Sequence, residues 1–201
     1  MSTVTKLNPI KREIVQLTIK GTSSYISYAW SEKALGMIRD KQAGKKTKTR
    51  DARDPEAEVQ AAAYYTEDGE FGIPAMAIKT AIIAAAHNDL GIPRTLVKKA
   101  LFLRCDDDNL VLPMTFSKMV AREDKVRVGQ GSSDLRYRPE FRNWSVTITF
   151  EFDAELLTQH DLVNLVNRAG FGVGIGEWRP EKGGEFGRFE IVDTAAALKA
   201  V

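Results

Sequence analysis

A glycine-rich stretch near the C-terminus, residues 170–189, limits the folds that this chain can adopt. It holds seven of the chain's 15 glycines and lies between a helical pattern at residues 156–169 and a strand pattern at 186–192. Glycine weakens regular structure, and it is kept where the backbone needs a positive φ or where another backbone approaches closely. The stretch therefore predicts an irregular loop between the last helix and the last strand.

The same loop carries side chains that suit contact with a phosphate chain. They are Trp178, Arg179, Lys182 and Arg188. Gly174 and Gly176 alternate with apolar residues, which predicts an extended segment with both glycines on one side. Two interpretations stay open: a loop that approaches nucleic-acid phosphates, or a glycine-bulged hairpin that turns a corner.

Composition excludes several classes of protein. The 201 residues are 43% hydrophobic and 28% charged, which is typical of one soluble globular domain. One cysteine excludes an internal disulfide, and with only two histidines we find no metal motif, no catalytic triad and no sign of a cofactor. No apolar run spans a membrane and no signal-peptide pattern is present, so we expect a cytoplasmic protein. The net charge is only +2, so any basic surface must be local.

The order of helical and strand patterns predicts an α+β fold. Strand patterns occupy residues 13–20, 101–105, 110–112, 144–152 and 186–192, and helical patterns occupy residues 75–87 and 156–169. Without insertions the order is β-α-β-β-α-β, the ferredoxin-like (RRM-like) antiparallel sheet with helices on one face. RNA-recognition modules use the open face of such a sheet.

Insertions interrupt this single domain of residues 1–201. Residues 40–58 are polar without apolar periodicity, which predicts a mobile basic loop. Its cations include Lys45, Lys46, Lys48 and Arg50. Residues 59–65 predict a further strand, joined to residues 70–73 by a turn.

A second basic segment, residues 134–144, interleaves Arg136, Arg138 and Arg142 with aromatic side chains. Guanidinium groups pair with phosphates and aromatic faces stack on unpaired bases, which favours binding to a single strand. The alternative is a strand whose aromatic residues enter the core and whose arginines face water.

Catalytic and metal-binding residues are not indicated. The aspartates at 106–108 lack the spacing of an EF-hand, and we expect a solvated turn. His87 and His160 have no evident partner base or nucleophile in the sequence. We therefore expect a protein without enzymatic activity.

Two motifs resemble the RAMP superfamily, the ferredoxin-like proteins that bind guide RNA in CRISPR effector complexes. Residues 73–81, Ile-Pro-Ala-Met-Ala-Ile-Lys-Thr-Ala, resemble the opening of the first core helix of backbone subunits, with Ala75 and Thr80 in place of the usual glycines. Ala169-Gly170, Gly174-Ile-Gly176 and Gly187-Arg-Phe189 resemble the C-terminal glycine-rich loop of that superfamily. The resemblance implies a compact backbone-type subunit, of CRISPR or phage origin, that binds RNA or single-stranded DNA.

These observations predict a single-strand nucleic-acid-binding protein that oligomerises along RNA or DNA, as a homo-oligomer or as a subunit of a larger nucleoprotein complex, away from membranes. The candidate contacts are Lys45, Lys46, Lys48, Arg50, Lys79, Arg136, Arg138, Arg142, Gly174, Gly176, Trp178, Arg179, Lys182 and Arg188. Two alternatives remain. One is a metal-dependent nuclease built on residues 106–108, and the other is a structural assembly protein without nucleic-acid contact.

Overall fold

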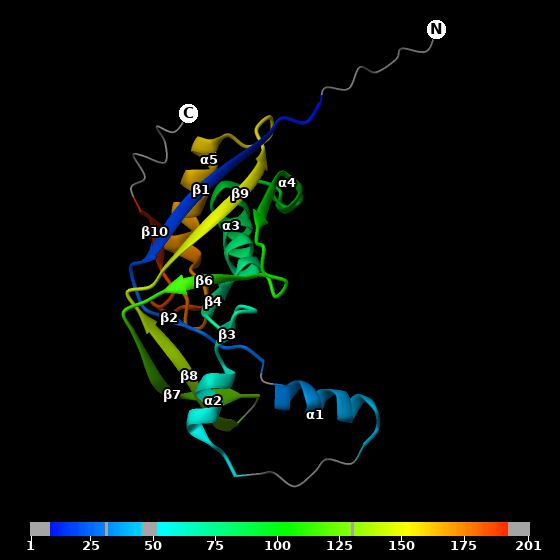
Figure 1. Ribbon diagram of the computed structural model, residues 1–201, viewed down its shortest axis with the longest axis vertical. Helices are drawn as coiled ribbons and strands as arrows, with labels where there is room; N and C mark the ends of the chain where they lie inside the picture. The colour runs from blue at the N-terminus through cyan, green and yellow to red at the C-terminus, as the bar shows by residue number, and fades with distance from the viewer. Residues whose placement is uncertain (1–8, 31, 46–51, 130, 193–201) are drawn as a thin grey trace.

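Six elements form the core of the structure, a computed structural model that describes residues 9–30, 32–45, 52–129 and 131–192 (Figure 1). In chain order they are β1 (Arg12–Gly21), α3 (Ala75–Leu90), β5 (Leu101–Arg104), β9 (Ser145–Asp153), α5 (Gln159–Arg168) and β10 (Phe189–Ile191). Their strands lie in the order β10-β1-β9-β5, and each neighbouring pair is antiparallel. The predicted α+β, ferredoxin-like arrangement is therefore confirmed.

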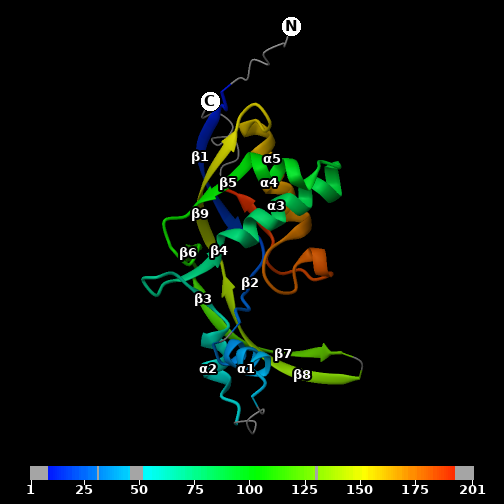
Figure 2. The ribbon, with the colours of Figure 1, turned by 90° about the vertical axis from the view of Figure 1, so that its right-hand side faces the viewer.

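Helices α3 and α5 cover one face of this sheet (Figure 2). Along β9, the alternate residues Ile148, Phe150 and Phe152 are buried, and Leu17 and Ile19 of β1 join them. Because successive strand residues point to opposite faces, the residues between them point away from the helices. We call that uncovered side of the sheet the outer face.

Local sequence signals set the ends of both core helices. α3 follows Pro74 and ends at Gly91, whose φ of 68° belongs to the left-handed region. α5 begins at Thr158, where the side chains of Thr158 and Asp161 form a capping box. Within the described residues, no helix is both long enough and apolar enough to cross a lipid bilayer.

Short strands extend the sheet past β9. β6 (Val111–Thr115) pairs with residues 145–146 of β9, β4 (Phe71–Pro74) pairs with β6, and β3 (Tyr64–Tyr65) pairs with β4. β5 pairs with residues 149–152 of β9 and follows a short helix, α4 (Arg94–Ala100). β5 and β6 therefore lie one after the other along the same edge of β9.

A long hairpin of β7 (Lys118–Val128) and β8 (Ser132–Arg142) projects on the side of the helices (Figure 2). A two-residue strand, β2 (Tyr25–Ile26), pairs with β8. We call β2, β7 and β8 the arm. A strand at residues 134–144 is one of the two interpretations that the sequence leaves open, but its pairing with β7 is not predicted. Gly129 and Gly131, which both have positive φ angles, lie between the two strands.

The strand predicted at residues 59–65 is present only at its end. A helix, α2 (Pro55–Ala61), covers residues 59–61, whereas β3 is extended and pairs with β4, as the predicted turn requires. The Asp54 side chain caps α2 by accepting two backbone N–H groups, and Pro55 suits its first turn. α1 (Glu32–Gln42) and α2 also make the two ends of the predicted basic loop helical, and residues 46–51 of that loop lie outside the described residues.

The glycine-rich loop is folded back on itself. A π-helical turn, η1 (Ala169–Val173), continues α5, and a 3-10 turn, η2 (Pro180–Lys182), follows. Gly174 and Gly176 have φ angles of 71° and 76°, so the prediction of an extended segment here is wrong. A Cβ atom at Gly176 would overlap the carbonyl oxygen of Ile26, so glycine at this position permits close contact with the arm.

Candidate nucleic-acid interface

Arg138 of the arm, predicted to meet phosphate, is buried inside the protein. The residue is 5% exposed, and its guanidinium lies 3.4 Å from a carboxylate oxygen of Asp124 and 3.2 Å from one of Glu177. It also lies 4.6 Å from the centre of the Tyr28 ring. Since Glu177 belongs to the glycine-rich loop, Arg138 joins that loop to the arm.

The two neighbouring arginines of the arm differ in exposure. Arg136 pairs with Asp134 at 3.1 Å, and its guanidinium donates a hydrogen bond to the Tyr28 hydroxyl. Arg142 pairs with Glu140 at 3.1 Å, but half of its side chain is exposed. Of the three predicted arginines, Arg142 is therefore the most open to a ligand.

Glu140 is the acid at the centre of this network. Its carboxylate accepts hydrogen bonds from Arg122 at 3.0 Å and from Arg142 at 3.1 Å. Burial raises the pKa of the Glu140 carboxyl, but hydrogen bonds from Arg122, Arg142 and Ser24 outweigh burial, and the pKa lies below its ordinary value. The arm thus holds Glu140 in its ionised form.

Replacing Glu140 with glutamine is expected to make stability less sensitive to acid. Because the pKa of Glu140 is lower in the folded than in the unfolded chain, its ionised form contributes stability above the unfolded value, about 4.3. That contribution disappears as pH falls through the lower folded value. Urea unfolding at a series of pH values should show a shallower loss for E140Q than for wild type below pH ~5. The exposed Glu67 supplies the control E67Q, and equal losses for wild type and E140Q would contradict the expectation.

Of the four candidate contacts in the predicted basic loop, the structure places one, Lys45. Lys45 pairs with Asp40, with Nζ 2.8 Å from the carboxylate. Lys46, Lys48 and Arg50 lie outside the described residues.

The glycine-rich loop presents an exposed indole. Trp178 is 42% exposed and has a φ of 54°, a conformation that non-glycine residues rarely adopt. Beside it, Arg179 is held by Glu181 at 2.8 Å. Lys182 is exposed, and no ion pair of Lys182 occurs within the described residues. Of the predicted contacts in this loop considered so far, Trp178 and Lys182 are thus the most open to a ligand.

Arg188, the last predicted residue of this loop, lies against an aromatic ring. Its guanidinium is 5.1 Å from the centre of the Phe171 ring and 3.8 Å from a carboxylate oxygen of Glu185. Phe171 itself is 72% exposed. Arg188 is therefore partly exposed, between the Phe171 ring and a long ion pair with Glu185.

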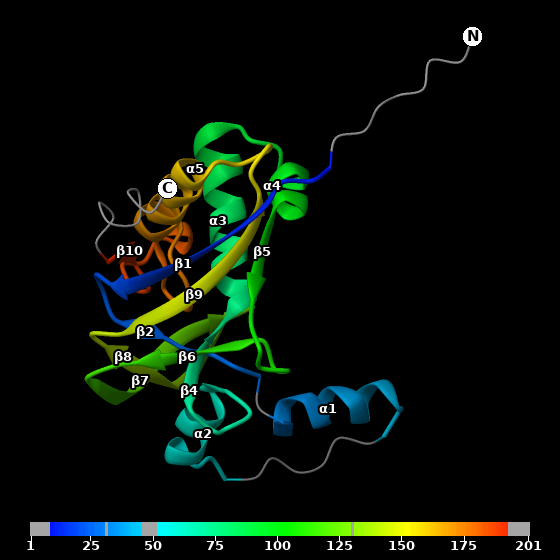
Figure 3. The ribbon, with the colours of Figure 1, turned by 45° about the horizontal axis from the view of Figure 1, so that its top comes forward.

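A basic surface that the sequence interpretation missed lies where α4 meets β5 at the sheet edge (Figure 3). Arg94, Lys98 and Lys99 of α4 are exposed, and none of them forms an ion pair within the described residues. Lys79 of α3 reaches the same place. Its Nζ lies 3.4 Å from the carbonyl oxygen of Lys98 and 4.4 Å from the centre of the Phe102 ring, and partial burial lowers its pKa.

We call this surface the basic edge. It comprises Lys79, Arg94, Lys98, Lys99, Phe102 and Arg104. A sequence signal for it exists, because residues 92–105 contain four cations and no acid. Of the candidates named from the sequence, Lys79 alone is placed here.

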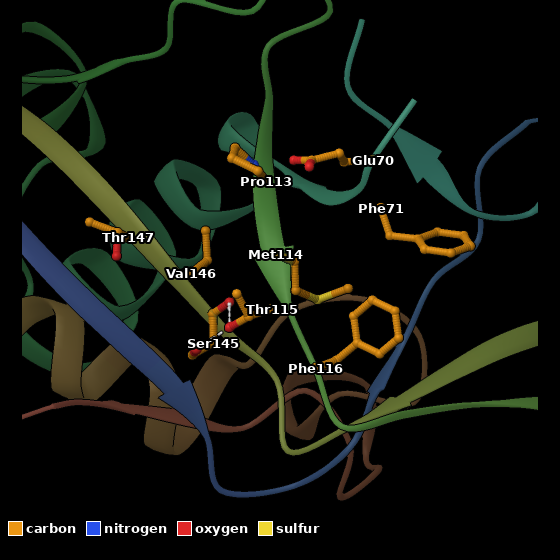
Figure 4. Close-up of a pocket in the computed structure, with 9 residues that line it drawn as sticks. All are labelled: Glu70, Phe71, Pro113, Met114, Thr115, Phe116, Ser145, Val146 and Thr147. Atoms are coloured by element: carbon orange, nitrogen blue, oxygen red, sulfur yellow. Dashed lines mark hydrogen bonds between the residues drawn. The ribbon is translucent and has the colours of Figure 1, made fainter. Parts of the chain in front are cut away.

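The basic edge continues onto the outer face. Phe102, 51% exposed, and Arg104 lie opposite Glu151 and Thr149 of β9. Glu151 is already paired with Arg104 at 2.9 Å and with Arg12 at 3.5 Å. Further along β9, the outer face has a pocket lined by residues of β4, β6 and β9 (Figure 4).

The aspartates at 106–108 form a turn between β5 and β6, as the sequence predicts. The Asp107 carboxylate accepts the backbone N–H groups of Glu67 at 2.7 Å and Val111 at 3.3 Å, which is a structural role. In the part of the chain that the structure describes, no three His, Cys, Asp or Glu side chains are grouped to hold a metal ion. His87 is exposed on α3, and His160 is exposed on α5.

No protein-family model matches this chain, and no curated protein matches it. Among solved structures, the chain is similar to one described as "Cryo-EM structure of the Type III-B Cmr-beta bound to cognate target RNA", with a TM-score of 0.44 and 14% sequence identity. The similarity covers 91% of this chain and 60% of that chain, so this chain spans less than two thirds of its length. The assignment of the ferredoxin-like fold follows from the strand order described above.

Proposed function

We propose that this protein binds single-stranded RNA or DNA without catalysing a reaction, and that it assembles along the strand. In this proposal it acts as a homo-oligomer or as a subunit of a larger nucleoprotein complex, in the manner of a CRISPR-associated RAMP backbone subunit or of a phage-encoded relative. The basic edge carries the proposal, because it combines Arg94, Lys98 and Lys99, which form no ion pair within the described residues, with Lys79 placed over the exposed ring of Phe102.

The chemistry of the basic edge suits an unpaired strand. Lys98 and Lys99 can each neutralise a phosphate, and every such contact releases counterions into solution. Phe102 can stack on an unpaired base, which a duplex would not offer. The exposed hydroxyl of Thr147 lies further along the same face, where a strand leaving the basic edge would pass.

The arm and the glycine-rich loop have a different part in this proposal. Arg138 and Glu177 connect the two, and Arg122 of the arm lies 4.7 Å from the centre of the Phe186 ring in the loop. We therefore assign these residues to orienting the arm. Arg142 of the arm, and Trp178 and Lys182 of the loop, remain candidate contacts for the strand.

An apolar groove between α3, α4 and α5 supports contact with a neighbouring subunit. The groove has a volume of about 860 Å³. Leu90, Leu156 and Phe171 line it and are exposed. Exposed apolar surface of this kind is common where proteins associate.

The double variant K98Q/K99Q tests the proposal. Anisotropy of a labelled mixed-sequence oligonucleotide should show affinity falling roughly ten-fold and the slope of log K against log salt flattening by about 1.4, which is two phosphate contacts at roughly 0.7 each. The variant K41Q/K125Q removes the same charge from exposed positions elsewhere and should bind like wild type. Unchanged affinity and slope for K98Q/K99Q would refute the basic edge as the binding surface. Intact oligonucleotide after incubation with Mg²⁺ is the expected result for a protein without nuclease activity.

A further inference from the structure

A pocket of about 520 Å³ opens on the outer face where β4, β6 and β9 meet (Figure 4). Phe71 and Phe116 form one wall, with Met114 beside them. The centres of the two rings are 5.7 Å apart, and the Phe116 ring packs 5.0 Å from that of the buried Phe141. The wall is therefore anchored in the core and offers apolar ring surface to a ligand.

Hydroxyl groups occupy the other side of the pocket. The hydroxyl oxygens of Thr115 and Ser145 are 2.7 Å apart, and either can donate the hydrogen bond between them. Thr147 lies further along β9, with its hydroxyl 2.9 Å from that of Thr18. Because a hydroxyl both donates and accepts, this side can bind the polar edge of a ring whatever its pattern of donors and acceptors.

Glu70 stands at the rim of the pocket (Figure 4). Its backbone bonds to Thr66, with the Glu70 N–H donating to the Thr66 hydroxyl at 3.1 Å. No ion pair or hydrogen bond of its carboxylate occurs within the described residues. An ionised carboxylate can only accept hydrogen bonds, so Glu70 favours a ligand that presents a donor.

We propose that this pocket takes one unpaired nucleobase whose exocyclic amino group lies on the major-groove edge, cytosine (N4) or adenine (N6), from the strand bound at the basic edge. The inference rests on the proposed function. The ring of the base would lie against Phe71 and Phe116, its polar edge would meet the hydroxyls, and its amino group would donate to Glu70. Thymine and uracil present a carbonyl oxygen in place of that amino group, so at this position the Glu70 carboxylate would face an acceptor and not a donor.

The placement of the pocket supports a common strand. Phe102 lies opposite Glu151 of β9, and Thr115 at the pocket lies opposite Ser145. At about 3.4 Å per residue, the six residue steps from Ser145 to Glu151 span roughly 20 Å, which several extended nucleotides would cover. Lys118, two residues beyond Phe116 in the chain, is exposed and can meet the phosphate of the bound nucleotide.

Binding of labelled oligo(dC) and oligo(dT) of equal length, measured by anisotropy at one salt concentration, tests the inference. Wild type should bind oligo(dC) roughly five-fold more tightly, the effect of one net hydrogen bond. E70Q should bring the two affinities together, because a glutamine amide can also donate to a carbonyl. The control E67Q, on the same turn but outside the pocket, should keep the wild-type preference.

A second variant tests the aromatic wall. F116L keeps an apolar side chain against Phe141 but removes the ring, and it should weaken binding to both oligonucleotides several-fold while melting within a few degrees of wild type. Equal affinities of wild type for oligo(dC) and oligo(dT), or a preference that E70Q retains, would overturn the pocket and leave the proposed function standing. Absence of binding to either oligonucleotide would overturn the proposed function and this inference with it.

Discussion

Replacing Gly187 with alanine is expected to lower the free energy of unfolding by about 3 kcal/mol or more. The φ of Gly187 is 68°, and a Cβ atom there would overlap the carbonyl oxygen of Ile175. The backbone cannot easily move away, because the N–H of Gly187 donates to the carbonyl of Ser24 at 2.8 Å and its carbonyl accepts from Ile175 at 3.0 Å. The free-energy cost of a left-handed alanine and the cost of displacing the backbone at Gly187 and Ile175 therefore add together.

Gly183 supplies the matched control. Its φ is 78°, but a Cβ atom added there would have no neighbour within 4 Å. G183A should therefore carry only the left-handed strain, about 1 kcal/mol. In thermal unfolding, G187A should melt roughly 6–12 °C below wild type and G183A roughly 2–4 °C below it. If the two variants melted at the same temperature, the close approach of the Ile175 carbonyl to Gly187 would make no contribution to the free energy of unfolding.

The close backbone contacts of glycines such as Gly187 explain why the glycine-rich stretch was a better guide to the fold of the chain than to its ligand. Gly170, Gly184 and Gly187 all lie where a Cβ would overlap backbone of the same chain. Such contacts form when a helix end, a loop and a strand meet, which is the junction that the sequence predicts. A role of Gly174 and Gly176 in approaching phosphates stays a prediction, since packing within the chain already accounts for glycine at both positions.

The core strands were predictable because their pattern reflects burial on one face. Val146, Ile148, Phe150 and Phe152 alternate with polar residues, and each is buried. The arm was not predictable in the same way. Its hairpin depends on which strands pair, and the pattern of either strand alone does not reveal that pairing. The helix at residues 55–61 had a local signal in Asp54-Pro55, since aspartate is favoured as an N-cap and proline in the first helical turn.

The candidate site was only partly predictable. Clustered cations in residues 92–105 are visible in the sequence, whereas the approach of Lys79 to Phe102 depends on the packing of α3 beside β5. Conversely, arginines among aromatic residues at 134–144 suggested a ligand, but all three are paired with acids. The partners of Arg136 and Arg142 lie two residues away in the sequence, whereas those of Arg138 come from distant positions. Asp124 lies on the paired strand and Glu177 in the glycine-rich loop. Charge along a sequence does not reveal which cations are already neutralised in the fold.

Variants of Arg138 and Arg142 can distinguish an arginine that is neutralised within the fold from one that is open to a ligand. Replacing Arg138 with methionine keeps much of its length but leaves the buried Asp124 with Arg122 alone and deprives Glu177 of its partner. Breaking a buried ion pair in this way destabilises a protein by about 3 kcal/mol or more. R142M removes a half-exposed arginine from the buried Glu140, which keeps its ion pair with Arg122 at 3.0 Å, so a smaller cost of about 1 kcal/mol is expected.

Urea unfolding and oligonucleotide binding on the same two variants separate structural from ligand-binding arginines. R138M should unfold at a distinctly lower urea concentration than R142M. Below its own unfolding transition, R138M should keep most of its affinity, since Arg138 is enclosed by the protein, whereas R142M should bind more weakly if Arg142 meets a phosphate. The interpretation from sequence alone predicts weaker binding by both variants, because it names both arginines as contacts to the strand. R138M with wild-type stability and reduced affinity would therefore restore that interpretation, and the burial of Arg138 between Asp124 and Glu177 is the physical reason to expect the opposite.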